Sequence, residues 1–192
     1  RVPRSSHQIG SIMEEKKQLR QQVKQEVSRL SPTERAETSV KIREQIEQLP
    51  LFTRAKAILL FHSLADEVDT HNWIERWHGV KEISLPVVNG DNLEIKRYTP
   101  DKTRRGAFGI TEPVGESLAD YSLLDLIIVP GVAFDPHRNR LGRGKGYYDR
   151  LLKKTVAPTI GVAYDCQIVR EIPALPHDVP MSLIISKSKI YQ

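Results

Sequence analysis

Residues 124–154 decide the fold, and they read LDLIIVPGVAFDPHRNRLGRGKGYYDRLLKK. The segment opens with an apolar run of strand length from Leu124 to Val129, interrupted only by Asp125. A loop rich in glycine and arginine follows to Gly146, and a helical pattern then runs from Tyr147 to Lys154. A fully apolar strand followed by a helix is typical of a parallel sheet that is covered on both faces. Ligands of such sheets bind where loops leave the carboxyl ends of strands, so this loop is the expected ligand site.

Helix and strand patterns alternate along the rest of the chain. An apolar stripe at steps of three and four residues predicts an amphipathic helix from Ser11 to Leu30. The segment Ser31-Pro32-Thr33-Glu34 has the spacing of a capped helix start, and that helix is predicted to run to about Leu49. Further helices are predicted after Thr70 and near 167–170, and strands over 56–61, 82–88, 93–99, 159–163 and 183–185.

Size and composition indicate one globular domain. The chain has 192 residues, of which 39% are hydrophobic and 28% are charged. The first ten residues, RVPRSSHQIG, read like an expression linker or tag remnant, which leaves residues 11–192 as the domain. The apolar runs are far shorter than the ~20 residues of a membrane helix, so no membrane span is predicted. The stretch from Pro100 to Ala119 is long and polar and is predicted to be a mobile loop.

The single cysteine, Cys166, has no partner for an internal disulfide, which suits a reducing compartment such as the cytosol. No Cys-His spacing supports a reactive nucleophile at this position. Cys166 is therefore predicted to be a small core residue.

Positive charge is concentrated in and around the glycine-rich loop. The formal net charge is +5, and residues 138–154 carry seven cations against one anion, Asp149. Three of these cations, Arg140, Arg143 and Lys145, are interleaved with glycines. Glycines leave main-chain amides open to phosphate oxygens, and the cations and the start of the following helix supply positive charge. The loop is predicted to bind a polyphosphate, and a solvated glycine-rich turn is the alternative.

The spacing of the loop separates it from two common nucleotide-binding motifs. It lacks the Lys-Ser or Lys-Thr pair of the Walker motif, and its third glycine comes two residues after the second, where the dinucleotide fingerprint needs three. Asp149 follows in the first turn of the predicted helix. A carboxylate at that position either holds hydrated Mg²⁺ or caps the helix.

Two further sets of charged residues fit the same site. Lys16, Arg20 and Lys24 recur every four residues on the first predicted helix, which indicates either a second phosphate contact or a solvated face. Glu67 follows the strand at 56–61, at the expected ligand edge, although its acidic neighbours are also typical of a plain turn.

Several other classes of protein are disfavoured. The six histidines show no paired zinc-ligand spacing, and the sequence has no Gly-x-Ser-x-Gly motif, which argues against metallohydrolases and serine hydrolases. A nucleic-acid-binding protein is the competing class, because the chain is basic. Its positive charge is gathered in one glycine loop with few aromatics beside it, so a compact anion fits better than RNA or DNA.

Together these segments resemble the 5-formyltetrahydrofolate cyclo-ligase family, also called 5,10-methenyltetrahydrofolate synthetases. The resemblance rests on KKQLR at 16–20, SLADEVDT at 63–70, FGITEP at 108–113, PGVAFD at 130–135 and, most specifically, RLGRGKGYYD at 140–149. It covers nearly the whole chain after residue 10. It implies a single α/β domain with three α/β/α layers and a mostly parallel central sheet.

The resemblance also implies an activity. Members of the family cyclise 5-formyltetrahydrofolate to 5,10-methenyltetrahydrofolate with ATP and Mg²⁺, and they release ADP and phosphate. ATP phosphorylates the formyl oxygen, nitrogen 10 attacks the activated carbon, and phosphate leaves. Cations and metal must stabilise the charge on the transferred phosphoryl group. The implied enzyme is a cytoplasmic monomer of one-carbon metabolism that binds small molecules and neither nucleic acid nor membrane; an inactive relative that only binds folate is a further alternative.

Matching motifs assign the site residue by residue. Lys145 and Arg143 are implied to lie nearest the transferred phosphate and to be catalytic. ATP is implied to contact Lys16, Arg20, Arg140, Leu141, Gly142, Arg143, Gly144, Lys145, Gly146, Tyr147 and Tyr148. The folate is implied to contact Glu67, Phe108, Arg143 and Tyr147, with Phe108 covering the pterin ring. Asp149 is the implied Mg²⁺ ligand, and Ser182 stands where some members have a second metal-site acid.

Overall fold

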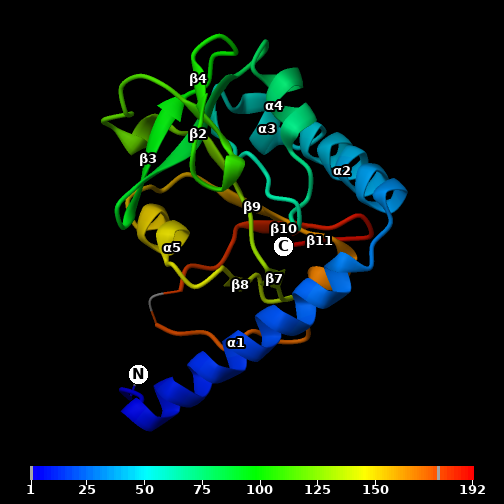
Figure 1. The fold of residues 1–192 in the computed structure, drawn as a ribbon, viewed down its shortest axis with the longest axis vertical. Helices are drawn as coiled ribbons and strands as arrows, with labels where there is room; N and C mark the ends of the chain where they lie inside the picture. Colours follow the sequence, from blue (N-terminus) through cyan, green and yellow to red (C-terminus); the bar gives the residue numbers. More distant parts are fainter. Residues whose placement is uncertain (1, 177) are drawn as a thin grey trace.

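The computed structural model describes residues 2–176 and 178–192 (Figure 1). Its α-helices are α1 (Ser6–Ser28), α2 (Pro32–Glu47), α3 (Pro50–Arg54), α4 (His71–Trp77) and α5 (Tyr147–Leu152). Its 3-10 helices are η1 (Ala107–Gly109), η2 (Tyr121–Leu123) and η3 (Asp165–Gln167). Its strands are β1 (Ala57–Leu59), β2 (Glu82–Asn89), β3 (Asn92–Arg97), β4 (Thr103–Arg105), β5 (Thr111–Pro113), β6 (Leu126–Val129), β7 (Ala133–Phe134), β8 (Arg140–Leu141), β9 (Thr159–Val162), β10 (Leu183–Ile185) and β11 (Ile190–Tyr191).

A seven-stranded sheet forms the centre of the molecule, in the order β11-β10-β9-β6-β1-β2-β3. The neighbours β10-β9-β6-β1-β2 are parallel, and the two edge strands, β11 and β3, pair antiparallel. Separate two-stranded hairpins are formed by β4 with β5 and by β7 with β8. The mostly parallel sheet that the sequence predicts is therefore confirmed.

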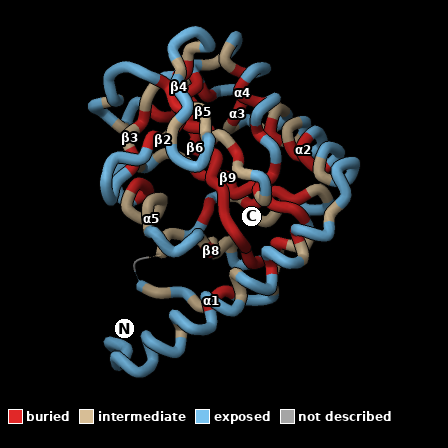
Figure 2. The backbone as a smooth tube through the Cα atoms, viewed as in Figure 1, coloured by how far each residue is buried: buried red, intermediate tan, exposed pale blue. Residues whose placement is uncertain are grey.

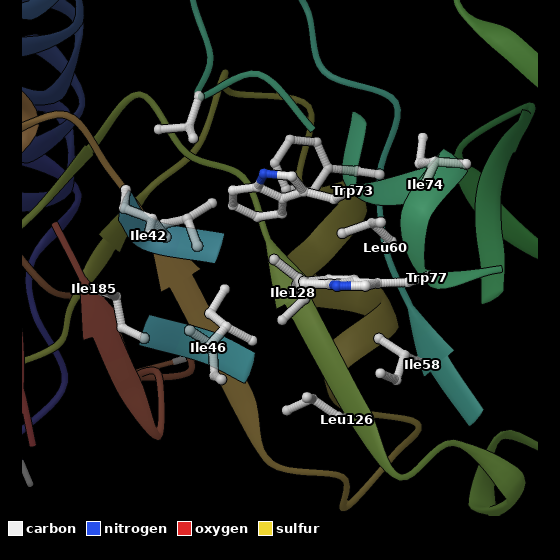
Figure 3. Close-up of a cluster of buried hydrophobic side chains, with 14 of the residues drawn as sticks. Ile42, Ile46, Ile58, Leu60, Trp73, Ile74, Trp77, Leu126, Ile128 and Ile185 are labelled. Carbon is white, nitrogen blue, oxygen red and sulfur yellow. The ribbon is translucent and has the colours of Figure 1, made fainter. Parts of the chain in front are cut away.

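Alternate residues of the central strands face two separate apolar cores. On one face Ile58, Leu126 and Ile128 pack in a cluster with side chains of α1, α2 and α4 (Figure 3). On the other face Leu59 and Ile127 share a cluster with side chains of α5. The sheet is thus the middle of three layers, as predicted for a single α/β domain.

The central strands are buried, whereas the loops and the outer faces of the helices are exposed to solvent (Figure 2). Every residue of β6 and of β9 is buried, whereas nearly all of α1 before Lys16 is exposed. Cys166 is half-buried against the core on the α1 side, which agrees with its predicted packing role. In residues 2–176 and 178–192, no helix is long and apolar enough to cross a membrane.

The first two helices begin at side-chain caps. α1 starts at Ser6 instead of Ser11, because the Ser5 hydroxyl accepts the N–H of Gln8 at 3.3 Å and the Gln8 side chain accepts the N–H of Ser5 at 2.9 Å. Residues 6–10, which read like linker, are therefore helical. α2 begins where predicted, with the Ser31 hydroxyl accepting the N–H of Glu34 at 3.1 Å.

Two predictions are wrong in detail. The stretch 100–119, predicted to be a mobile loop, contains the β4–β5 hairpin, and Arg104 in this hairpin pairs at 3.4 Å with the buried carboxylate of Glu112. The strands are too short and polar to show a strand pattern. The helix predicted near 167–170 is replaced by η3, where the Gln167 side chain bonds the N–H of Tyr164 at 2.9 Å and the carbonyl of Gly131 at 3.1 Å. These side-chain bonds to the main chain compete with a longer helix.

A buried carboxylate fixes the segment that leads into the glycine-rich loop. Asp135 is fully buried and accepts hydrogen bonds from the N–H groups of His137, Asn139 and Ile172 at 3.0, 2.9 and 2.9 Å. The Asn139 side chain donates a further bond at 3.0 Å. Because Ile172 comes from the segment after η3, these bonds hold the β7–β8 hairpin in place and so set where the loop begins.

The fit of the hairpin against the sheet gives a stability prediction. A Cβ added at Gly161 in β9 would lie 2.6 Å from the ring of the fully buried Phe134. We expect Gly161→Ala to lower the free energy of unfolding by about 1–3 kcal/mol in urea titrations, because overpacking forces neighbours to shift. Gly79→Ala is the control, since no atom lies within 4 Å of its added Cβ. Equal stability of the two variants would contradict this packing.

Candidate functional site

The candidate site lies at the carboxyl edge of the sheet. The chain places β2 on one side of β1, and it later places β6, β9 and β10 on the other side, so the strand order reverses between β1 and β6. Ligands of open α/β sheets bind at such a reversal. Residues 60–67 leave β1 at this point, and residues 130–146 leave β6 there and pass through β7 and β8. The glycine-rich loop is therefore at the edge where the sequence predicts a ligand.

Arg143 of this loop forms ion pairs with two carboxylates that follow β1. Its terminal nitrogens lie 3.2 and 2.5 Å from the two carboxylate oxygens of Asp66, and one of them lies 3.5 Å from Oε2 of Glu67. Burial acts to lower the pKa of Arg143, but the two carboxylates outweigh burial, and the pKa is raised. Burial likewise acts to raise the pKa of Asp66, but the hydrogen bond from Arg143 and its charge lower it. The pairing therefore stabilises both charged forms.

Glu67 is the deeper of the two carboxylates. The residue is 7% exposed, and its Oε1 accepts the N–H of Leu64 at 2.8 Å. Burial raises the pKa of Glu67, although the Leu64 amide and the charge of Arg143 oppose this shift. Its main-chain carbonyl accepts the hydroxyl of Tyr164 at 3.0 Å, which fixes the backbone at this point. A buried carboxylate with a raised pKa at a ligand edge is typical of a functional site.

α1 runs past β8 (Figure 1), and two of the cations predicted on this helix contact the chain in this region. Nε of Arg20 donates to the carbonyl of Gly142 in the loop at 2.7 Å. One helical turn earlier, the buried Lys16 pairs with Asp178 at 3.2 Å, and Asp178 also accepts the N–H of Leu175 at 2.7 Å. Arg20 therefore contacts the loop directly, whereas Lys16 contacts the chain that leads into β10.

The side chain of Arg140 is largely buried in the site. Its Nε donates to the carbonyl of Pro130 at 2.7 Å, and its Nη1 lies 3.6 Å from Oδ1 of Asp149. Burial lowers the pKa of Arg140, and the negative charges of Asp149, Glu67 and Asp178 oppose that shift. The guanidinium also lies 5.1 Å from the ring centre of Tyr148, whose pKa is raised by burial. Arg140 is thus fixed from several sides.

The loop itself presents main-chain donors. From Arg143 to Asp149, no main-chain N–H finds an acceptor within the described part of the chain. Gly144 and Gly146 have positive φ angles of 103° and 72°, a region that favours glycine. Leu141 and Gly142 lead into this segment, and Lys145 in its middle is exposed. Successive free amides with left-handed glycines form a concave binding surface for anions.

The two residues expected to contact the pterin are placed differently. The hydroxyl of Tyr147 donates to the carbonyl of Gly90 at 3.3 Å, in the turn after β2, so Tyr147 lies beside the loop. Phe108 lies in η1 at the end of the β4–β5 hairpin and is 80% exposed. Its φ of 58° turns the chain sharply at this residue. The structure therefore brings Tyr147 to the loop and leaves Phe108 in solvent.

The carboxylates determine where Mg²⁺ could bind. Ser182 does not take the place of a second acid, because its hydroxyl accepts the N–H of Thr159 at 2.9 Å at the amino ends of β9 and β10, opposite the candidate site. Asp178 instead joins Asp149 in the surroundings of Arg140. No group of three or more metal-ligating side chains occurs among residues 2–176 and 178–192. Mg²⁺ at Asp149 would therefore complete its shell with phosphate oxygens and water.

Sequence reasoning misses two carboxylates of this site. In the sequence, the acidic neighbours of Asp66 make it resemble an ordinary turn residue. In the structure it is the main partner of Arg143. The one sequence feature that points to Asp66 as a site residue is its position directly before Glu67, at the ligand edge of the sheet. Asp178 has no local signal, because its partner Lys16 lies 162 residues earlier in the chain.

Known proteins match the chain over most of its length. The model of the 5-formyltetrahydrofolate cyclo-ligase family matches residues 12–187. The 5-formyltetrahydrofolate cyclo-ligase of Escherichia coli (strain K12) is 30% identical over 180 residues, which cover 88% of this chain and 99% of that protein. The protein of the same name from Haemophilus influenzae is 34% identical over 179 residues, and the match covers 85% of this chain and 95% of that protein.

Two solved structures share the fold. The NMR structure of 5,10-methenyltetrahydrofolate synthetase from Aquifex aeolicus has a TM-score of 0.84 and 37% identity and covers 92% of both chains. The 5,10-methenyltetrahydrofolate synthetase from Mycoplasma pneumoniae has a TM-score of 0.73 and 27% identity, and the match covers 90% of this chain and 98% of that chain. The family resemblance that the motifs indicate is therefore confirmed by sequence and by structure.

The raised pKa of Glu67 gives a prediction about pH. In the native protein this pKa lies above the ordinary value of 4.5, so the native state binds the proton more tightly than the unfolded chain does. The resulting stability is complete below the unfolded pKa and is lost as the pH rises through the native pKa. We therefore expect the free energy of unfolding of the wild type, minus that of Glu67→Gln, to fall in urea titrations as the pH rises above the ordinary carboxyl value of 4.5. A difference that increases over this range would mean that Arg143, not burial, dominates the titration.

Proposed function

Because the chain belongs to the 5-formyltetrahydrofolate cyclo-ligase family, we propose that it cyclises 5-formyltetrahydrofolate to 5,10-methenyltetrahydrofolate while ATP is converted to ADP and phosphate. The observation that carries this proposal is the ion pair between Arg143 and Glu67. The family resemblance assigns Arg143 to the nucleotide and Glu67 to the folate. A contact between them at one sheet edge supports a site where a phosphoryl group passes from one substrate to the other.

The chemistry needs an activated formyl oxygen. In the proposed reaction the terminal phosphoryl group of ATP moves to that oxygen, and ADP is released. Nitrogen 10 then attacks the formyl carbon, the carbon–oxygen bond breaks, and phosphate and the proton of nitrogen 10 leave. Phosphoryl transfer depends on positioning and on stabilisation of charge on the phosphoryl oxygens. The cations and free amides of the loop are suited to both tasks.

The proposed roles follow from the position of each side chain. Lys145 is exposed and has no ion-pair partner within the described chain, so it is free to meet the transferred phosphoryl group. The side chain of Arg143 reaches from the loop to Glu67 and would stabilise the same charge from the folate side. Lys16, Arg20 and Arg140 would hold the remaining phosphates, and Asp149 would hold Mg²⁺, which neutralises phosphate charge when bound. Glu67 and Tyr147 would contact the pterin.

We also propose that the protein works in the cytosol. Its single thiol belongs to Cys166, and burial raises the pKa of that thiol, which keeps it protonated and unreactive. A stable unreactive thiol suits a reducing compartment.

One assay tests the function directly. The protein is mixed with Mg²⁺, ATP and 5-formyltetrahydrofolate, and the ultraviolet absorbance of the methenyl product is followed. Absorbance that rises only when ATP is present supports the proposal. Folate binding without turnover would instead indicate an inactive relative, and tight oligonucleotide binding that ATP cannot displace would indicate a nucleic-acid-binding protein.

Lys145→Ala should separate catalysis from folding. We expect turnover to fall by roughly 10²-fold, because a preorganised charge at the transition state is lost. Thermal unfolding should be nearly unchanged, because Lys145 is exposed and its removal leaves no buried group unpaired. Lys154→Ala, which removes another exposed cation, is the control and should keep full turnover. Near-normal turnover of Lys145→Ala would remove Lys145 from the catalytic role.

Phe108→Ala tests the proposed cover over the pterin. Phe108 is 80% exposed, so its truncation should leave stability unchanged. Stacking on the pterin would contribute on the order of 1 kcal/mol beyond the buried area, so the Kd for 5-formyltetrahydrofolate should rise several-fold while the Kd for ATP stays the same. Calorimetry with each substrate measures both Kd values. Leu123→Ala is the control, because it also truncates an exposed apolar side chain, at a residue that is 58% exposed. Weaker ATP binding with intact folate binding would place Phe108 on the nucleotide side.

A further inference from the structure

Arg150 of α5 ties the glycine-rich loop to the end of β2. Its Nη2 donates to the carbonyl of Lys145 at 2.9 Å and also to the carbonyl of Asp91, in the turn between β2 and β3. Its guanidinium lies 5.5 Å from the ring centre of Tyr147, and the hydroxyl of Tyr147 bonds to Gly90 in the same turn. One side chain therefore connects three elements around the loop.

The bond to Lys145 also sets the direction of the next amide. In a trans peptide the carbonyl of one residue and the N–H of the next point in opposite directions. Because the Lys145 carbonyl points to Arg150, the N–H of Gly146 points away from Arg150. That N–H has no acceptor among the described residues and belongs to the row of free amides in the loop.

The backbone at Gly146 fits this arrangement. Its φ is 72°, and a Cβ at this position would lie 2.7 Å from Nη1 of Arg150. Glycine both allows the left-handed conformation and leaves space for the guanidinium. Nε of Arg150 is buried without a partner, which is unfavourable by itself, so the contacts of the other nitrogens must hold the side chain in place.

We propose that Arg150 is a positioning residue for the anion-binding loop. It holds the Lys145–Gly146 peptide so that the Gly146 N–H faces the bound polyphosphate, and it keeps the loop fixed against the β2–β3 turn. The inference rests on the proposed ATP-dependent function. It extends that function, because Arg150 is not among the residues assigned to either substrate.

Three variants test this role. Arg150→Met removes the donors but keeps an unbranched chain beside Tyr147, and Arg150→Lys keeps the positive charge. Lys153→Met is the matched control, because it removes an exposed cation at the end of the same helix. We expect Arg150→Met to raise the Kd for MgATP about tenfold by calorimetry and to raise the KM for ATP more than it lowers kcat. Arg150→Lys should restore part of this affinity, and Lys153→Met should bind as the wild type does.

Hydrogen exchange without ligand gives a second readout. The main-chain N–H of residue 150, which donates to the carbonyl of Gly146 at 3.1 Å, should exchange several-fold faster in Arg150→Met than in the wild type, because the loop loses its anchor, and should be unchanged in Lys153→Met. A lower melting temperature with unchanged MgATP affinity and unchanged exchange would assign Arg150 a purely structural role and overturn the proposal. A wild-type protein that does not bind MgATP would overturn the proposed function, and this role with it.

Discussion

The ion pairs of Arg143 with Asp66 and Glu67 are the interaction on which the site depends. They join the glycine-rich loop to the segment after β1, 77 residues earlier in the chain. The three side chains are partly or largely buried, so solvent and salt screen their attraction less than that of an exposed pair. The contact also places a cation of the loop against Glu67, a carboxylate whose pKa is raised by burial.

Three other cations of the site also have partners, whereas Lys145 is exposed. Arg140 faces Asp149, Lys16 faces Asp178, and Arg20 bonds to a loop carbonyl. Buried charges are costly without such partners, and each pair offsets part of that cost. A polyphosphate that entered the proposed site would meet cations already held in position, and it would compete for them with carboxylates and carbonyls. Binding then exchanges one set of charge pairs for another, so little side-chain order has to be created at that moment.

The scaffold beneath the loop is rigid where the site needs fixed geometry. Asp135 holds the β7–β8 hairpin with buried hydrogen bonds, and Phe134 packs closely on Gly161 of β9. The β4–β5 hairpin differs, because its tip carries the exposed Phe108. Because the tip is little buried, its movement costs little free energy. Movement of the base of the glycine-rich loop would instead break several buried hydrogen bonds at once. In the proposed function, ATP would therefore meet fixed geometry, and the folate would meet an adaptable tip.

Local sequence signals account for most elements of the fold. The apolar run of β6, the stripe of α1, the cap at Ser31 and the glycine-cation loop each depend on residues close together in the chain, where periodicity and composition are informative. The β4–β5 hairpin escapes such reasoning, because strands of three residues show no usable alternation.

By itself the sequence therefore determined the α/β class, the buried central strands and the loop that carries positive charge. The tertiary structure alone decided which acid meets which cation. Asp66 reaches Arg143 because β1 and β6 are neighbours in the sheet, and Asp178 reaches Lys16 because α1 passes the segment before β10. Ser182 points to Thr159 because of the register between β9 and β10. Contacts of this kind depend on sheet order and register, which are set by the packing of the whole core and leave no pattern in neighbouring residues.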